Sequence, residues 1–205
     1  MKKVFKTNKF CRNLANVLRT TLIILFWVIA IYTVILYGTN KEVVQNPKFT
    51  DGDLKVIMID VGNGDCFLVL QNNKAMLIDN GFFSTYSNIE KVLKENNVKK
   101  IDYAILTHLH PDHVGGTYLL FLNYRVNNLY MMEHMDNVDM SLSDKLFYYQ
   151  TMAMIKYNNL FANNIVNVVV GESDYDFQFA DSQVQFLGPL NNNYEKVNDY
   201  SLVFK

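Results

Sequence analysis

The chain has 205 residues, of which 50% are hydrophobic and 19% are charged. This length suffices for one domain with an appendage, and the composition excludes wholesale disorder. Two cysteines, Cys11 and Cys66, exclude a disulfide framework. From residue 41 onward, 13 basic and 20 acidic residues leave a net charge of −7. An acidic balance does not indicate a nucleic-acid-binding surface, but it does not exclude a nuclease, because bound metal ions would supply positive charge locally.

The segment from Thr20 to Tyr37 contains no charge, glycine or proline. Its length approaches the roughly 20 residues that cross a bilayer, so it predicts a transmembrane anchor over residues 20–38 after a basic tail, residues 1–19. A buried core helix and a cleaved signal peptide are the alternatives. A signal peptide has an apolar stretch of only about 7–15 residues and ends in small residues, unlike Leu36-Tyr37-Gly38. The basic tail predicts a single-pass protein of the cell membrane with a cytoplasmic N-terminus and an extracellular main domain.

The remaining chain predicts a layered α/β domain after a polar linker, residues 39–53. Short apolar runs separated by turns indicate an antiparallel meander first, and strands alternating with helices afterwards. The expected strands are residues 54–60, 66–70, 75–78, 101–106, 128–132, 165–170, 174–179, 184–187 and 201–204. The expected helices are residues 88–96 with Asn88 as the cap, residues 114–124, and residues 143–160 with Ser143 as the cap.

Three of the four histidines fall within six residues, and Asp112 lies among them. On an extended segment His108 and His110 point to the same side, where they can hold one metal ion. Pro111 then forces a turn that brings Asp112 and His113 toward a second metal position. Imidazole nitrogen and carboxylate oxygen suit zinc, and Mn or Fe is compatible with them. The alternative is a histidine-rich surface loop that binds nothing.

The run from Thr107 to Gly116, THLHPDHVGG, is similar to the signature of the metallo-β-lactamase superfamily. Further runs resemble the ComEC-like competence hydrolase domains within it, over roughly residues 54–205. These runs are Ile59–Cys66 (IDVGNGDC), Leu77–Gly81 (LIDNG), Phe186–Pro189 (FLGP) and Asn198–Val203 (NDYSLV). The resemblance implies an αββα sandwich with metal ions, normally two zinc ions, at one edge of two packed sheets.

The resemblance also implies roles for particular residues. The four motif residues are expected to be metal ligands, namely His108, His110, Asp112 and His113. Asp79 matches a carboxylate that lies beneath the metals and would orient an imidazole by accepting its other N–H. Asp60 and Asp65 lie in the first glycine loop, residues 60–65, and are candidates for shaping the site. For Asp65, a role as a plain turn residue is an equal alternative.

The sequence departs from the family pattern at its end. The family's remaining ligands follow the NDYSLV-like strand, and this sequence stops at Lys205. It therefore carries half of a binuclear site, and the second sheet is expected to lack strands and to leave apolar core exposed. A piece of a longer protein is favoured over a complete but degenerate protein, because no terminating signal precedes Lys205. The fourth histidine, His134, is predicted to be a surface-loop residue.

The predicted function is that of a membrane-anchored, metal-dependent hydrolase of a phosphoester, with DNA as one candidate substrate. Bound metal ions would lower the pKa of a water molecule, and Asp112 is expected to orient that water and take its proton. A small phosphoester or a phosphocholine-like cell-surface group is a second candidate substrate. A truncated, non-catalytic, membrane-tethered domain with a partial metal site is the alternative function. A β-lactam substrate is less favoured, because the motifs match other members of the superfamily better.

Overall fold

The computed structural model describes residues 17–18, 21, 44–131, 140–161, 167–170, 175–190 and 194–205. The chain divides into two compact units, Met1–Asn40 and Lys41–Lys205. Apart from Thr21, the predicted membrane span lies outside the described residues, and so do Cys11 and His134. Among the helices that the structure describes, none is long and apolar enough to cross a membrane.

The larger sheet has six strands whose order in space follows the chain. The strands are β1 (Lys55–Met58), β2 (Phe67–Gln71), β3 (Lys74–Ile78), β4 (Lys100–Ile105), β5 (Arg125–Met131) and β6 (Asn167–Val170). β1, β2 and β3 pair antiparallel, which confirms the predicted meander. β3 to β6 are parallel neighbours. The central strand β4 is buried at five of its six positions, as expected for a parallel strand covered on both faces.

A second, antiparallel sheet packs against the first. It contains β7 (Asp176–Phe179), β8 (Ser182–Gly188) and β9 (Val203–Phe204). Aromatic rings fill the space between the sheets. Phe177 stacks on Tyr103 of β4 and on Tyr130 of β5, with ring centroids 4.7 and 4.5 Å apart. These stacked rings, and the buried Phe179 and Phe186 beside them, hold the two sheets face to face.

An apolar pocket of about 280 Å³ lies between the first three strands and the second sheet. Its lining includes Leu54, Val56, Met76, Val184 and Phe204. Leu54 and Val56 are 51% and 57% exposed.

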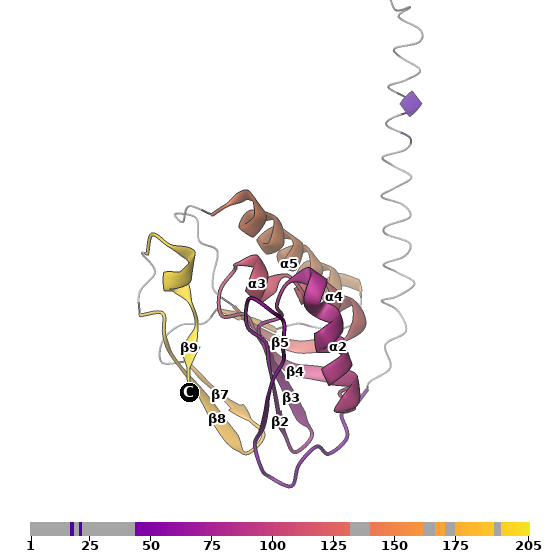
Figure 1. The fold of residues 1–205 in the computed structure, drawn as a ribbon, viewed down its shortest axis with the longest axis vertical. Coiled ribbons are helices and arrows are strands. Elements are labelled where there is room, and N and C mark those ends of the chain that lie inside the picture. Colours follow the sequence, from indigo (N-terminus) through magenta and orange to yellow (C-terminus); the bar gives the residue numbers. More distant parts are fainter. Residues whose placement is uncertain are drawn as a thin grey trace, which may run out of the picture. The chain divides into compact units, whose positions relative to one another are not determined.

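Helices cover the other face of the larger sheet (Figure 1). They are α2 (Tyr86–Glu95), α3 (Pro111–Val114), α4 (Thr117–Asn123) and α5 (Leu142–Phe161), with the short 3-10 turns η1 (Phe83–Thr85) and η2 (Val197–Tyr200). This arrangement confirms the predicted layered α/β fold. The described residues form three layers, one of helices and two of strands, so the second helical layer of the expected αββα sandwich is not seen among them.

The start of α2 differs from the prediction. Asn88 is not its cap but lies inside the helix, which begins at Tyr86. The side-chain amide of Asn88 donates instead to the backbone carbonyl of Asp60, 2.9 Å away. A tertiary contact with the first glycine loop therefore uses the side chain that local sequence reasoning assigned to the helix end.

The start of α5 also differs. The predicted cap, Ser143, lies inside the helix, and Ser141 takes that role. The hydroxyl of Ser141 accepts the backbone N–H of Asp144 at 3.2 Å, and the carboxylate of Asp144 accepts the backbone N–H of Ser141 at 3.1 Å. This reciprocal pair is a capping box.

The helix predicted over residues 114–124 is two helices. α3 begins at Pro111, inside the histidine motif, where the ring of proline presets the helical φ angle. Gly115 and Gly116 separate α3 from α4. A Cβ at Gly116 would lie 2.3 Å from the carbonyl oxygen of Asn80, so only glycine lets this turn approach the loop after β3 so closely.

Candidate metal centre

The candidate site lies at the edge of the larger sheet where β3 and β4 end. Parallel neighbours end at the same edge, so the residues that follow β3 and β4 meet there. β2 runs antiparallel to β3, with Phe67 opposite Ile78, so the loop that precedes β2 reaches the same edge. This topology brings Asp65, Asp79 and the histidine motif together, although up to 48 residues separate them in the chain.

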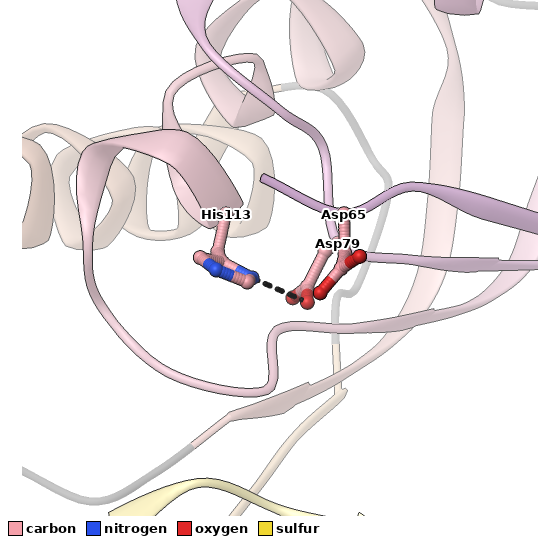
Figure 2. Close-up of side chains that lie close together, drawn as sticks. All are labelled: Asp65, Asp79 and His113. Carbon is pink, nitrogen blue, oxygen red and sulfur yellow. Dashed lines mark hydrogen bonds and ion pairs between the residues drawn. The ribbon is translucent and has the colours of Figure 1, made fainter. Parts of the chain in front are cut away.

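Asp79 is the central acceptor of the site. It is 1% exposed, and its backbone adopts a φ of +54° directly after β3. Its Oδ2 accepts the Nδ1–H of His113 at 2.8 Å and the hydroxyl of Thr107 at 2.6 Å. Its Oδ1 accepts the backbone N–H of Thr107 at 2.8 Å. Three donors thus satisfy this buried carboxylate, and Figure 2 shows it directed at the His113 ring.

The ring of His108 lies against the rings of the other two histidines of the motif, His110 and His113. The ring centroids of His108 and His113 are 3.9 Å apart, and those of His108 and His110 are 5.0 Å apart. His108 is buried, with 9% of its surface exposed. The segment that was expected to gather imidazoles on one side does bring these rings together.

The environment favours an uncharged His108 ring. Burial, together with the neighbouring His113 and His110 rings, lowers its pKa to about 4. At His113, burial also lowers the pKa, but the hydrogen bond and the charge of Asp79, with Asp112 and Asp65, raise it above the ordinary value overall. A neutral imidazole is the form that binds a metal ion.

Asp112 lies next to the free nitrogen of His113. Its Oδ2 is 3.8 Å from the Nε2 of His113, the nitrogen that Asp79 does not use. α3 carries both residues, and its backbone packs against the first glycine loop. A Cβ at Gly64, whose φ is +96°, would lie 2.0 Å from the Asp112 carbonyl oxygen, so only glycine fits there.

The two acidic residues of the first glycine loop differ in position. Asp65 is exposed, and one of its carboxylate oxygens lies within 4.8 Å of ligand atoms of Asp79 and His113 (Figure 2). Asp60 is exposed as well, but its Oδ1 accepts the backbone N–H of Gly62 at 3.0 Å. The structure therefore gathers Asp65 with Asp79 and His113, whereas the described contacts of Asp60 are those of a turn residue.

Sequence reasoning missed Thr107 as a functional residue. It directly follows β4 and precedes His108, and its backbone carbonyl accepts the N–H of Leu202 at 2.8 Å. The resemblance of residues 107–116 to the family signature was a signal for Thr107, because that run begins with it. No local signal pointed to Leu202, since the contact joins residues 95 positions apart.

The sequence profile of the Metallo-beta-lactamase superfamily matches residues 59–184, more than half of the chain. The chain belongs to the metallo-β-lactamase superfamily. The predicted family is thereby confirmed, and its members generally bind metal ions. The matched region includes every candidate ligand of the histidine motif. No curated protein matches the sequence.

Several solved structures are similar to this chain at low sequence identity. The Rm3 metallo-beta-lactamase has a TM-score of 0.50 and 10% identity, over 84% of this chain and 58% of its own. A motif mutant of a metallo-beta-lactamase from Cronobacter sakazakii has a TM-score of 0.45 and 14% identity, over 64% of this chain and 50% of its own. The apo chemotaxis sensor ODP from T. denticola has a TM-score of 0.45 and 16% identity, over 68% and 50%. The chain thus spans between half and three fifths of the length of these structures.

The residues of the motif fit a metal ion. Three imidazoles and one carboxylate lie together, and these are the donor types that zinc and iron accept. Asp79 holds the Nδ1 of His113, which leaves the Nε2 of His113 beside Asp112 for a metal. The group Asp65, Asp79 and His113 also has metal-ligand spacing, but hydrogen bonds occupy both oxygens of Asp79. Asp79 therefore suits the orientation of a ligand better than direct ligation.

Proposed function

We propose that this protein is a membrane-anchored, metal-dependent hydrolase that cleaves a phosphoester. The observation that carries the proposal is the buried hydrogen bond from His113 to Asp79, beside a cluster of three imidazoles and Asp112. The Nε2 of His113, the Asp112 carboxylate and the His110 ring form no hydrogen bond with the described residues and are available as metal ligands. They lie at the edge of a fold whose family binds metals.

The proposed roles follow from position. His108 and His110 would hold one ion, and Asp112 and His113 would hold a second. A bound ion lowers the pKa of a water molecule and polarises the substrate. Asp112 orients the attacking water and takes up its proton, because it is the one carboxylate of the motif and is accessible in part. Asp79 keeps His113 in the tautomer that leaves its Nε2 free.

The substrate and the location are parts of the same proposal. The resemblance to ComEC-like domains favours a phosphoester, with DNA as one candidate, over a β-lactam. The excess of acidic residues after residue 40 favours a small phosphoester over a long polyanion. The apolar run from Thr20 to Tyr37 anchors the chain in the cell membrane, and the preceding basic residues place the hydrolase domain outside the cell.

The test begins with metal content. The full-length chain, purified in detergent, is loaded with zinc, manganese or iron, and bound metal is counted by mass spectrometry. Hydrolysis is then measured with bis(p-nitrophenyl) phosphate, p-nitrophenyl phosphate, single-stranded DNA and a chromogenic cephalosporin. The proposal expects bound metal and cleavage of at least one phosphoester.

A double variant, His108→Ala with His110→Ala, is expected to abolish tight zinc binding, because two of the proposed ligands are removed. His134→Ala is the matched control, since it changes the one histidine outside the motif. Unchanged metal content in the double variant contradicts the ligand assignment. Metal binding without any hydrolysis favours the alternative of a non-catalytic, membrane-tethered domain.

A further inference from the structure

We infer that Thr107 is a positioning residue that relays the orienting effect of Asp79 to His108, so that one buried carboxylate sets the tautomers of two metal-facing histidines. The functional significance of this inference rests on the proposed metal site. Its geometry rests on four hydrogen-bond contacts among Asp79, Thr107, His108 and His113.

The contacts form an unbroken chain of polar atoms. The Oγ1 of Thr107 lies 3.2 Å from the Nδ1 of His108 and 2.6 Å from the Oδ2 of Asp79. The same Oδ2 lies 2.8 Å from the Nδ1 of His113. The backbone N–H of Thr107 donates to the Oδ1 of Asp79 at 2.8 Å, which holds the threonine in place independently of its hydroxyl.

The direction of each hydrogen bond follows from the supply of protons. A carboxylate only accepts, and a threonine hydroxyl has a single proton to donate. If that proton pointed to His108, two acceptor oxygens would face each other at 2.6 Å without a hydrogen between them. The hydroxyl therefore donates to Asp79 and accepts from His108, whose proton lies on Nδ1.

The consequence concerns the metal-facing atoms. With Nδ1 protonated, His108 directs the lone pair of Nε2 away from Thr107, as His113 does relative to Asp79. Both rings are thereby prepared to ligate through Nε2 before a metal arrives. No described residue forms a hydrogen bond with the His110 ring, so His110 serves as an internal comparison.

The test reads the tautomers directly, in metal-free protein. The full-length chain is labelled with 15N-histidine, stripped of metal by a chelator and studied in detergent at pH 8.5. Two-bond 1H–15N correlation spectra distinguish Nδ1–H from Nε2–H for each of the four histidines. The expected result in the wild type is Nδ1–H for both His108 and His113. Nε2–H at His108 in the wild type overturns the inference without any variant.

The variant Thr107→Val removes the hydroxyl but keeps the branched shape and the backbone N–H. The expected result is a shift of at least half of His108 to Nε2–H, with no change at His113 or His110. Zinc affinity, measured by competition with a chelating dye, is expected to fall about 10–100-fold. Thr107→Ser restores the hydroxyl and is expected to restore both readouts.

An unchanged His108 tautomer in Thr107→Val, or an unchanged zinc affinity despite a changed tautomer, overturns the inference. Because a lost packing contact would not move a tautomer, the spectra separate positioning from a general structural role. The tautomer result also stands apart from the proposed function. The tautomer of His108 can be measured even if the protein cleaves no phosphoester. Conversely, an active hydrolase with Nε2–H at His108 would still contradict the inferred role of Thr107.

Discussion

Asp79 is the residue on which most of the site geometry depends. Its carboxylate is buried and satisfied by His113 and by two donors of Thr107. A charged acceptor in a buried position forms stronger hydrogen bonds than a neutral one. Removal of its charge therefore weakens the orientation of the histidine motif without a large change in shape.

Asp79→Asn is expected to lower zinc affinity about 10–100-fold, because the amide keeps the shape but loses the negative charge that holds the Nδ1–H of His113. The measurement is a competition titration with a chelating dye. Asp60→Asn is the matched control, since among the described residues the Asp60 carboxylate accepts a hydrogen bond only from the N–H of Gly62, in its own loop. Equal affinity in the two variants would show that Asp79 does not orient a ligand.

Gly64, in the first glycine loop, lies so close to α3 that a side chain there should destabilise the fold. Gly64→Ala is expected to lower the free energy of unfolding by about 3 kcal/mol or more, because a positive φ is strained for alanine and the new Cβ collides with the Asp112 carbonyl. Gly62→Ala is the control. Gly62 also has a positive φ, +73°, but nothing lies within 4 Å of the added Cβ.

For Gly62→Ala the expected cost is therefore only about 1–2 kcal/mol. Urea unfolding followed by circular dichroism measures both variants. Similar losses in the two would mean that the contact between Gly64 and α3 is looser than the structure describes.

At the scale of elements, hydrogen bonds of Asn46 join the segment before β1 to the start of β4. The buried side chain of Asn46 donates to the Lys100 carbonyl and to Asp102, both at 3.0 Å. Its Oδ1 accepts the backbone N–H groups of Lys99 and Lys100 at 2.9 and 3.0 Å. Asp102 is itself buried and lies 3.2 Å from the Lys100 ammonium, so these two buried charges pair with each other.

Asn46→Ala is expected to lower the free energy of unfolding by about 2–4 kcal/mol, because it leaves several buried donors and acceptors of β4 without partners. The measurement is the urea midpoint at constant slope. Gln45→Ala, at an exposed neighbouring position, is expected to change stability by less than about 0.5 kcal/mol. A loss below about 1 kcal/mol for Asn46→Ala would mean that water replaces these contacts.

The elements also show where local patterns sufficed and where they did not. Apolar runs between turns predicted the strands of the meander, because each strand carries its own periodicity. The helix caps were predicted wrongly, since Asn88 binds the loop at Asp60 and Ser141 takes the role expected of Ser143. Polar side chains near a helix end have several partners within reach, and tertiary packing chooses among them.

At the scale of the whole molecule, the membrane anchor is the prediction with the largest consequence. We expect the full-length chain to sediment with membranes and to resist extraction by alkaline carbonate, because the run from Thr20 to Tyr37 is uncharged and long enough to span. Ile24→Arg with Ile29→Arg is expected to release the chain, since each arginine costs about 2.5–3.5 kcal/mol at the centre of a span.

The matched control places two arginines on the exposed face of α5. Leu146→Arg with Tyr149→Arg changes residues that are each 61% exposed, and it is expected to leave the membrane fraction unchanged. A wild-type chain that carbonate extracts would contradict the anchor. Release by both double variants would indicate that the effect comes from added charge alone.

The sequence by itself determined the family, the strand pattern and the motif that supplies the candidate ligands. These features are local. A strand, a glycine turn or a histidine cluster is encoded in a few consecutive residues, and the profile match over residues 59–184 adds up such local features. The ligand types also set the class of chemistry, because imidazole and carboxylate donors limit the metals that bind.

Only the tertiary structure decided which side chains hold the motif in place. Asp79 and Thr107 meet because β3 and β4 are parallel neighbours, and Asp65 joins them because β2 runs in the opposite direction. Pairing and register depend on contacts between segments far apart in the chain. The partners of a buried polar group are chosen by that packing, since a donor or acceptor removed from water must find whichever partner the fold places within reach.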